Sequence, residues 1–242
     1  MIELKDFSIG FRHRTLLCDV NVTIGSGSLT ALIGRNGTGK STLLRAIAGL
    51  NKNYNGQIML GDRDIKDMGA GDMARTLAFV TTERTRIPNL KCEDVVAIGR
   101  APYTNWIGRM QETDREIVKR SLAQVGMADY ALRTMDKMSD GECQRIMIAR
   151  ALAQDTPIIL LDEPTSFLDM PNRYELCELL GRLAHEQSKC ILFSTHELDI
   201  ARSLTDNIAL LDSPCLIYKS TGEMRNGGYI EQLFNLDKWK IT

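Results

Sequence analysis

The chain has 242 residues and a formal net charge of −1, with 43% hydrophobic and 25% charged residues. This composition is that of an ordinary soluble globular protein, long enough to bury a core in one domain, and it excludes nucleic acid as the default partner. No apolar run reaches the roughly 18 residues of a membrane-spanning helix, and the opening residues MIELKDFSIGF lack the basic and apolar regions of an export signal.

The first thirty residues predict an N-terminal β layer, because apolar and polar side chains alternate there as in half-buried antiparallel strands. The next stretch predicts a strand followed by a helix. Residues 29–34 (LTALIG) form a short apolar run that ends in glycine, and residues 41–50 (STLLRAIAGL) have helical spacing closed by Gly49. A glycine-containing loop is therefore expected between a buried strand and a helix.

Residues 88–155 predict a helical insert. One of its helices is expected to open with a capping box formed by Thr113 and Glu116, since Ser/Thr followed three residues later by Glu is the pattern of that motif. The last helix of the insert is expected to stop before Pro157, which cannot continue it.

Two strands and a helix follow the insert. Residues 158–161 and 190–194 are continuous apolar runs of strand length, separated by a helix that starts near Pro171. Alternating strands and helices predict an α/β core with a parallel sheet. We therefore expect the core to comprise residues 1–87 and 156–242, with the helical insert between them.

The six cysteines are scattered along the chain, without a CxxC pair or the spacing of a metal site. We expect reduced, mostly structural thiols, which are typical of the cytoplasm. These residues are Cys18, Cys92, Cys143, Cys177, Cys190 and Cys215.

Residues 34–41 (GRNGTGKS) match the pattern G-x-x-x-x-G-K-[ST] in full, at the predicted loop between strand and helix. Glycines let the backbone wrap around phosphates, Lys40 reaches the β and γ oxygens, and Ser41 can bind Mg²⁺. The alternative is a chance glycine-rich turn. The candidate nucleotide-binding residues are Gly34, Asn36, Gly37, Gly39, Lys40, Ser41 and Thr42.

Acidic residues follow the apolar run in LLDEP, at 160–164. Asp162 is expected to emerge at the carboxyl end of a buried strand, where open α/β sheets bind ligands, and to hold Mg²⁺ there. Glu163 can polarise an attacking water. The alternative is that these carboxylates only cap the next helix. His196 leaves the end of another predicted strand and is expected to contact the γ-phosphate, although a lone histidine is commonly a surface residue.

A second helix start lies in MSDGECQR, at 138–145. Ser139 and Glu142 have the spacing of a capping box, so a helix is expected to begin here, with free amide groups and the positive end of its dipole. On these residues alone, a well-capped helix is a sufficient interpretation.

Five motifs together resemble an ABC-type ATPase in their order and approximate spacing. The resemblance implies a P-loop ATPase fold with an N-terminal antiparallel β layer and an inserted helical subdomain, and it implies ATP and Mg²⁺ as ligands. It extends from Ile2 to about Leu211. The motifs are GRNGTGKS, MSDGE at 138–142, LLDEP, SFLD at 166–169 and STH at 194–196.

The resemblance implies a head-to-tail homodimer in which two ATP molecules are sandwiched. Ser139, Gly141 and Glu142 would then belong to the site of the partner's nucleotide, and Asp169 to the loop that crosses the interface. Phe11 takes the place of an aromatic residue that stacks on adenine, with a core strand residue as the equal alternative.

Two positions depart from the family's pattern. A glutamine is expected after the strand LAFV, but Thr82 occupies that place with Glu83 beside it. We count Thr82 with Ser41 and Asp162 as candidate metal positions. Asp140 stands where glycine is usual, and we expect its carboxylate to point away from the nucleotide.

Residues 93–106 (EDVVAIGRAPYTNW) resemble the ATPases of importers for ferric siderophores, haem and cobalamin. This resemblance implies polytopic permease subunits, a substrate-binding protein and a peripheral position on the cytoplasmic face of the membrane. A helix of the permease would dock near this segment. The alternative is that GRAPY is only a helix end and a turn.

Two other functions remain open at this point. A soluble ABC-type ATPase of DNA repair or translation lacks a permease, but its long insertions or tandem cassettes do not fit 242 residues. A small-molecule kinase or nucleotide switch uses the same phosphate loop, but it leaves the motifs MSDGE and STH unexplained.

Overall fold

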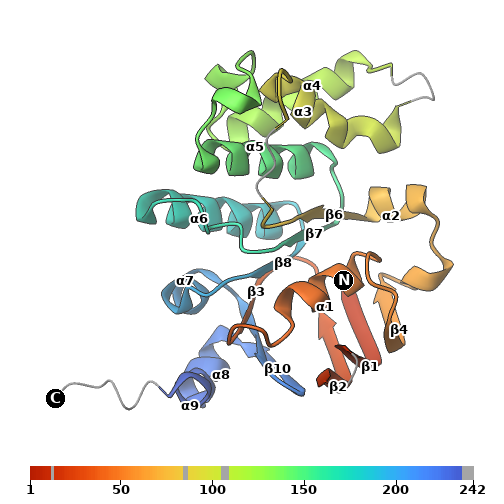
Figure 1. Ribbon diagram of the computed structural model, residues 1–242, viewed down its shortest axis with the longest axis vertical. Coiled ribbons are helices and arrows are strands. Elements are labelled where there is room, and N and C mark those ends of the chain that lie inside the picture. Colours follow the sequence, from red (N-terminus) through yellow and green to blue (C-terminus); the bar gives the residue numbers. More distant parts are fainter. Residues whose placement is uncertain (12–13, 84–86, 105–108, 236–242) are drawn as a thin grey trace.

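The computed structural model describes residues 1–11, 14–83, 87–104 and 109–235. Helical and sheet layers follow one another along the long axis of the molecule (Figure 1). The predicted boundaries at 87/88 and 155/156 stay predictions. Parts of the predicted domain lie outside the described residues, at 12–13, 84–86, 105–108 and 236–242.

The central sheet has six strands in the order β10-β9-β3-β8-β7-β6. The five strands from β9 to β6 run parallel and β10 is antiparallel to β9, so the predicted parallel sheet is confirmed, with an antiparallel edge. Every residue of β7 and β8 is buried, which explains their continuous apolar sequences. The strands are β3 (Ser28–Gly34), β6 (Leu77–Val80), β7 (Ile158–Leu161), β8 (Cys190–Ser194), β9 (Asn207–Asp212) and β10 (Cys215–Ser220).

A second, antiparallel sheet forms the predicted N-terminal β layer. Alternate side chains of β1 are buried, among them Phe7, whose ring lies 5.5 Å from that of Tyr54. These side chains share one apolar core with α1 (Lys40–Ile47) and with one face of the central sheet. In sheet order the strands are β2 (Arg14–Ile24), β1 (Ile2–Phe11), β4 (Tyr54–Leu60) and β5 (Arg63–Asp64).

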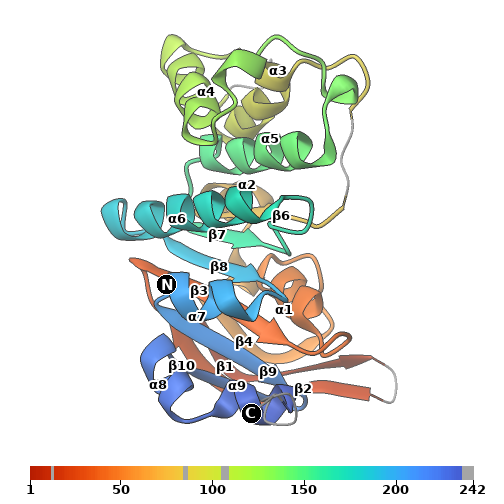
Figure 2. The same ribbon diagram turned by 90° about the vertical axis from the view of Figure 1, so that its left-hand side faces the viewer.

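A second core lies on the other face of the central sheet and continues into the helical subdomain. Here α6 lies between the sheet and the helical group α3, α4 and α5 (Figure 2). The helices are α3 (Cys92–Ala97), α4 (Glu112–Gln124), α5 (Asp140–Ala153), α6 (Met170–Glu186), α7 (Leu198–Leu204), α8 (Thr221–Asn226) and α9 (Tyr229–Phe234). The remaining elements are η1 (Ile65–Asp67), α2 (Ala70–Thr76), η2 (Ile98–Tyr103), η3 (Ala128–Tyr130) and η4 (Met135–Lys137).

The capping box expected at Thr113 and Glu116 is wrong. Helix α4 begins at Glu112, and its capping box joins Gln111 and Asp114. Asp114 accepts a hydrogen bond from the Gln111 amide at 2.9 Å and forms an ion pair with the buried Arg100, also at 2.9 Å. This long-range partner fixes the carboxylate of Asp114, and with it the helix start, two residues before the expected place.

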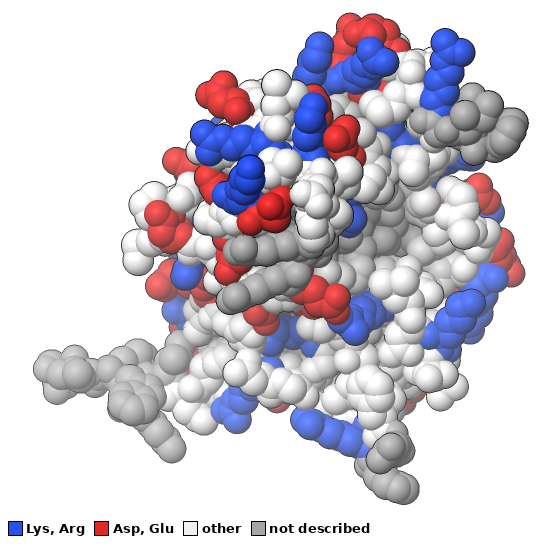
Figure 3. All heavy atoms as spheres, turned by 45° about the horizontal axis from the view of Figure 1, so that its top comes forward, with Lys and Arg blue, Asp and Glu red and all other residues white. Residues whose placement is uncertain are grey.

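Within the described ranges, no helix has both the length and the apolar character needed to cross a membrane. Figure 3 shows basic and acidic side chains interspersed over one face, rather than gathered by sign. All six cysteines are free thiols, and only Cys18 and Cys215 are exposed.

Candidate nucleotide site

The phosphate loop joins the end of β3 to the start of α1. Two of its glycines adopt positive φ, 73° at Gly37 and 109° at Gly39. A Cβ atom on Gly34 would lie 2.6 Å from the carbonyl oxygen of Leu211, so a larger residue does not fit there. A tight glycine-rich loop that leads into a helix N-terminus offers backbone amides and a positive dipole end to an anion.

Lys40 is folded back into this loop. Its Nζ donates hydrogen bonds to the carbonyl oxygens of Gly34 at 2.9 Å and Arg35 at 3.3 Å. The residue is 6% exposed. Burial lowers the pKa of the Lys40 ammonium, and the carboxylates of Glu163 and Asp162 oppose that shift. Because carbonyl oxygens are neutral, anionic phosphate oxygens would be stronger partners for the Lys40 ammonium.

A cavity of about 560 Å³ opens beside the loop. It brings together most residues that the sequence singled out for the nucleotide. Phe11 is 57% exposed at this cavity, so it is not a core strand residue, which was the alternative interpretation. The lining residues are Phe11, Arg14, Leu16, Asn36, Gly37, Gly39, Lys40, Ser41, Thr42, Glu163 and His196.

Asp162 follows β7 and is 3% exposed. Its Oδ1 accepts two hydrogen bonds, from Ser41 Oγ at 3.0 Å and from Ser194 Oγ at 2.7 Å. A serine hydroxyl beside a carboxylate is the type of oxygen set that Mg²⁺ prefers. Ser41 and Asp162 therefore fit a magnesium site next to the phosphate loop.

Glu163 and His196 form a pair at the rim of the cavity. Nε2 of His196 lies 2.7 Å from Oε1 of Glu163, and Ser166 Oγ donates to the other carboxylate oxygen at 3.1 Å. Glu163 has a φ of 49°, in the left-handed region that residues other than glycine seldom adopt. Strained backbone of this kind is concentrated at functional sites, which supports a role for this carboxylate.

The Thr82 side chain contacts the same cluster at the backbone of Asp162. Its Oγ1 donates to the carbonyl oxygen of Asp162 at 2.9 Å, and the neighbouring Glu83 pairs with Arg45 of α1 at 3.1 Å. The hydroxyl that replaces the expected glutamine thus joins the ends of β6 and β7. The metal role assigned to Thr82 stays a prediction.

The helix start at Ser139 lies apart from this cavity, which no described residue of α5 lines. The predicted capping box is present, because the Ser139 amide donates to Glu142 Oε2 at 2.8 Å and the Glu142 amide donates to Ser139 Oγ at 3.2 Å. The Ser139 backbone amide is the main cause of a lowered pKa for Glu142. A Cβ atom on Gly141 would lie 3.0 Å from the carbonyl oxygen of Phe167, in the loop before α6.

Sequence reasoning missed three residues that the structure places at the site. Arg14 and Leu16 line the cavity from the start of β2. Ser194 is fully buried and bonds to Asp162, although in the sequence it is only the first letter of the motif STH. Its position at the end of a buried strand was the available signal, because parallel strands end at one edge of the sheet.

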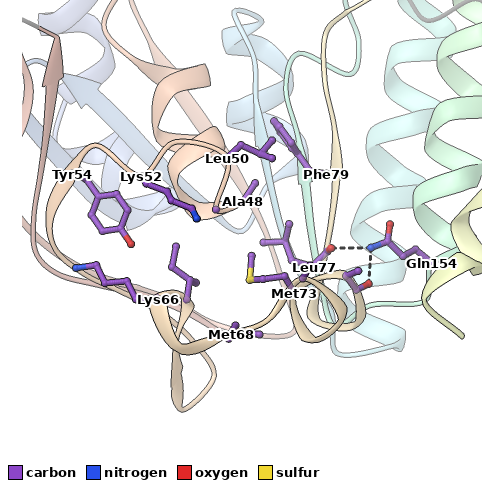
Figure 4. A pocket seen from close by; sticks show the side chains of 14 residues that line it. Ala48, Leu50, Lys52, Tyr54, Lys66, Met68, Met73, Leu77, Phe79 and Gln154 are labelled. Atoms are coloured by element: carbon purple, nitrogen blue, oxygen red, sulfur yellow. Dashed lines mark hydrogen bonds between the residues drawn. The ribbon is translucent and has the colours of Figure 1, made fainter.

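A separate groove of about 590 Å³ lies between the end of α1, α2 and the start of β6 (Figure 4). Leu50 at its edge is 67% exposed. Gln154 closes one end by donating to the carbonyl oxygens of Ala74 at 2.7 Å and Leu77 at 2.9 Å. The other lining residues are Ala48, Gly49, Lys52, Tyr54, Ile65, Lys66, Met68, Ala70, Met73 and Phe79.

Comparisons with known proteins agree with this geometry. The family model "ABC transporter" matches residues 17–166. The iron(3+)-hydroxamate import ATP-binding protein FhuC of Bacillus subtilis is 34% identical over 242 residues, which cover 100% of this chain and 90% of that protein.

Solved structures are similar over nearly the whole chain. A chain of a putative metal-chelate type ABC transporter in an inward-facing conformation has a TM-score of 0.84 and 25% identity, covering 97% of this chain and 88% of that one. A dimeric ATP-binding cassette in a post-hydrolysis state, bound to ADP and Pi, has a TM-score of 0.80 and 26% identity, covering 91% and 99%.

Proposed function

The chain belongs to the ABC transporter family, and we propose that it is the ATP-hydrolysing subunit of an importer for an iron-siderophore, haem or cobalamin type substrate. The observation that carries this proposal is the cluster at the phosphate loop, where Ser41 meets Asp162 and His196 meets Glu163. The names of similar proteins support the substrate class: one imports iron(3+)-hydroxamate, and one belongs to a metal-chelate type transporter.

The residues of the cluster divide the work of hydrolysis. Lys40 exchanges its carbonyl partners for the β and γ oxygens of ATP, and Glu163 accepts a hydrogen bond from the attacking water and orients it. His196 holds Glu163 and lies where it steadies the charge that develops on the γ-phosphate. Ser41 and Asp162 would hold magnesium, whose charge would offset that of the phosphate oxygens.

The functional unit is a homodimer in which each chain completes the other's site. Ser139, Gly141 and Glu142 form a helix start suited to an anion, and this helix start lies away from the chain's own cavity. Asp169, which caps α6 by accepting from the Asn172 amide at 3.2 Å, lies in the exposed loop expected at the interface. Asp140 directs its carboxylate away from the partner's nucleotide.

The groove between α1 and α2 receives a cytoplasmic helix of a polytopic permease, to which a substrate-binding protein delivers cargo. Its mainly apolar lining and the exposed Leu50 suit the apolar face of a helix. The segment 93–106 lies next to it, because Arg75 of α2 donates to the carbonyl oxygen of Pro102 at 3.2 Å. Residues 105–106 of that segment are outside the described part. The chain is thereby peripheral on the cytoplasmic face of the membrane.

Co-purification from membranes tests this proposal. A tagged chain is expected to bring down a polytopic membrane protein, and Leu50→Glu is expected to abolish that association because it places a charge in the groove. Leu132→Glu, at an equally exposed leucine outside the groove, is the matched control. Phosphate release without transfer to an acceptor distinguishes the ATPase from a kinase. Retention of the membrane protein by the Leu50→Glu variant contradicts docking in this groove.

A further inference from the structure

Ser194 is the last residue of β8 and is 0% exposed. Its strand is held in register by β3 on one side, where Leu32 faces Ser194, and by β7 on the other, where Leu161 faces Phe193. The serine side chain therefore has a fixed position at the carboxyl edge of the sheet, one residue beyond the end of the pairing with β7.

The single hydroxyl of Ser194 serves two neighbours at once. It donates to Oδ1 of Asp162 at 2.7 Å and accepts the backbone N–H of Glu163 at 2.8 Å. A serine hydroxyl has one O–H donor and two acceptor lone pairs, so its only donor and one of its acceptor positions are used. One buried oxygen atom thus connects the carboxylate of Asp162 to the backbone that carries Glu163.

Both connections bear on groups that the reaction uses. Ser41 is the other hydroxyl on Oδ1 of Asp162, and Ser41 is itself a candidate magnesium ligand. The hydroxyl of Ser194, in contrast, bonds to Asp162 and to the Glu163 amide. Ser194 is thus the donor dedicated to orienting Asp162. The Glu163 amide belongs to a residue with a φ of 49°, and a strained backbone persists only where its surroundings hold it.

We propose that Ser194 is a positioning residue that sets the Asp162 carboxylate for magnesium and the Glu163 carboxylate for water through one shared hydroxyl. This inference rests on the proposed magnesium-dependent hydrolysis of ATP. Outer partners of metal ligands fix ligand orientation, and their loss typically costs about 10- to 100-fold in metal affinity or activity. A purely structural serine would instead affect stability and leave the magnesium dependence unchanged.

The test is the affinity of a fluorescent ATP analogue for Ser194→Ala, measured in EDTA and across a Mg²⁺ titration. In EDTA the affinity is expected to match that of the unaltered protein, because the phosphate loop is intact. The Mg²⁺ concentration at half-saturation is expected to rise about tenfold or more, and the maximal turnover to fall by a similar factor. An unaltered protein without any Mg²⁺ dependence would contradict the proposed magnesium site itself, which is a separate outcome.

Two further variants separate positioning from packing. Ser121→Ala removes a serine that is also buried, 1% exposed, but lies in α4 of the helical subdomain, so its Mg²⁺ half-saturation is expected to stay unchanged. Ser194→Thr retains the hydroxyl, and its Mg²⁺ concentration at half-saturation is expected to be close to that of the unaltered protein. An unchanged half-saturation in Ser194→Ala overturns the proposal, and so does a folded Ser194→Thr protein that behaves like Ser194→Ala.

Discussion

The phosphate loop and the helix start at Ser139 are both suited to an anion, but they differ in the residues that surround them. Around the loop, segments from β1, α1, β7 and β8 meet at one cavity, and Ser41 and Ser194 each donate a hydrogen bond to Asp162. At the helix start, the two hydrogen bonds of the capping box join only Ser139 and Glu142.

The two regions therefore arise in different ways: one from strands that are distant in sequence, the other from a single helix start. In the core, the carboxyl ends of the parallel strands lie at one edge of the sheet, and the functional side chains that follow these strands are therefore close together. The helical subdomain presents a capped helix start whose positive dipole end suits an anion, and this start lies away from the chain's own cavity. In the proposed homodimer, the partner's nucleotide supplies that anion.

The largest effect is expected from Glu163→Gln, which alters only the core region. The amide cannot accept a proton as the carboxylate does, so turnover is expected to fall by about 100- to 10,000-fold, while ATP binding is retained and an ATP-bound dimer accumulates. Steady-state phosphate release and size-exclusion chromatography with ATP measure the two outcomes. Turnover at the original rate would remove Glu163 from the mechanism.

Arg100→Met is expected to destabilise the helical subdomain without altering the nucleotide site. Arg100 is 7% exposed, pairs with Asp114 at 2.9 Å and donates to the carbonyl oxygen of Ala153 at 2.8 Å. Removing it leaves a buried carboxylate unpaired, so the free energy of unfolding is expected to drop by about 3 kcal/mol. Urea unfolding measures this loss, and nucleotide affinity is expected to stay unchanged.

The matched control for that variant is Arg115→Met. Arg115 forms an exposed pair with Glu112 at 3.8 Å on the same helix, which is expected to contribute less than about 1 kcal/mol. Equal losses of stability in Arg100→Met and Arg115→Met would contradict the role given to the buried pair.

A smaller effect is expected from pH. The Gln111 amide, and after it the Arg100 guanidinium, lower the pKa of Asp114 below its ordinary value, although burial opposes them. The stability from these contacts is therefore present above the unfolded pKa of about 3.9 and is lost as pH falls through the lower folded pKa.

Urea unfolding of Asp114→Asn against the unaltered protein isolates this contribution. The variant is expected to be less stable by about 1 kcal/mol at neutral pH, a deficit that stays constant down to about pH 5 and shrinks below it. A deficit that grows as the pH falls would have the wrong sign for this carboxylate.

Local sequence patterns predicted the elements that carry the phosphate loop. An apolar run, a glycine-rich turn and helical spacing specify β3, the loop and α1 because each signal is contained within a few residues. The helix start at Ser139 was predictable for the same reason, since its capping box spans only four residues.

Features that depend on contacts between residues distant in sequence could not be predicted. The helix start at Glu112 depends on Arg100, which is distant in sequence from the cap that it stabilises. The contacts of Ser194 with Asp162 depend on the pairing of β7 with β8, where Ile158 faces Cys190, and no local pattern gives that register. Such contacts appear only when the strands are placed side by side.

Mixing two defective variants tests most directly that each chain owns half of a catalytic site. Lys40→Ala disables the phosphate loop, and Ser139→Asp keeps a helix-capping residue while placing a negative charge against the partner's γ-phosphate. Each variant alone is expected to be inactive, whereas random mixing forms dimers with one intact site and restores about one quarter of full turnover. Activity that does not rise above the sum of the separate variants, although mixed dimers form, would contradict the shared site.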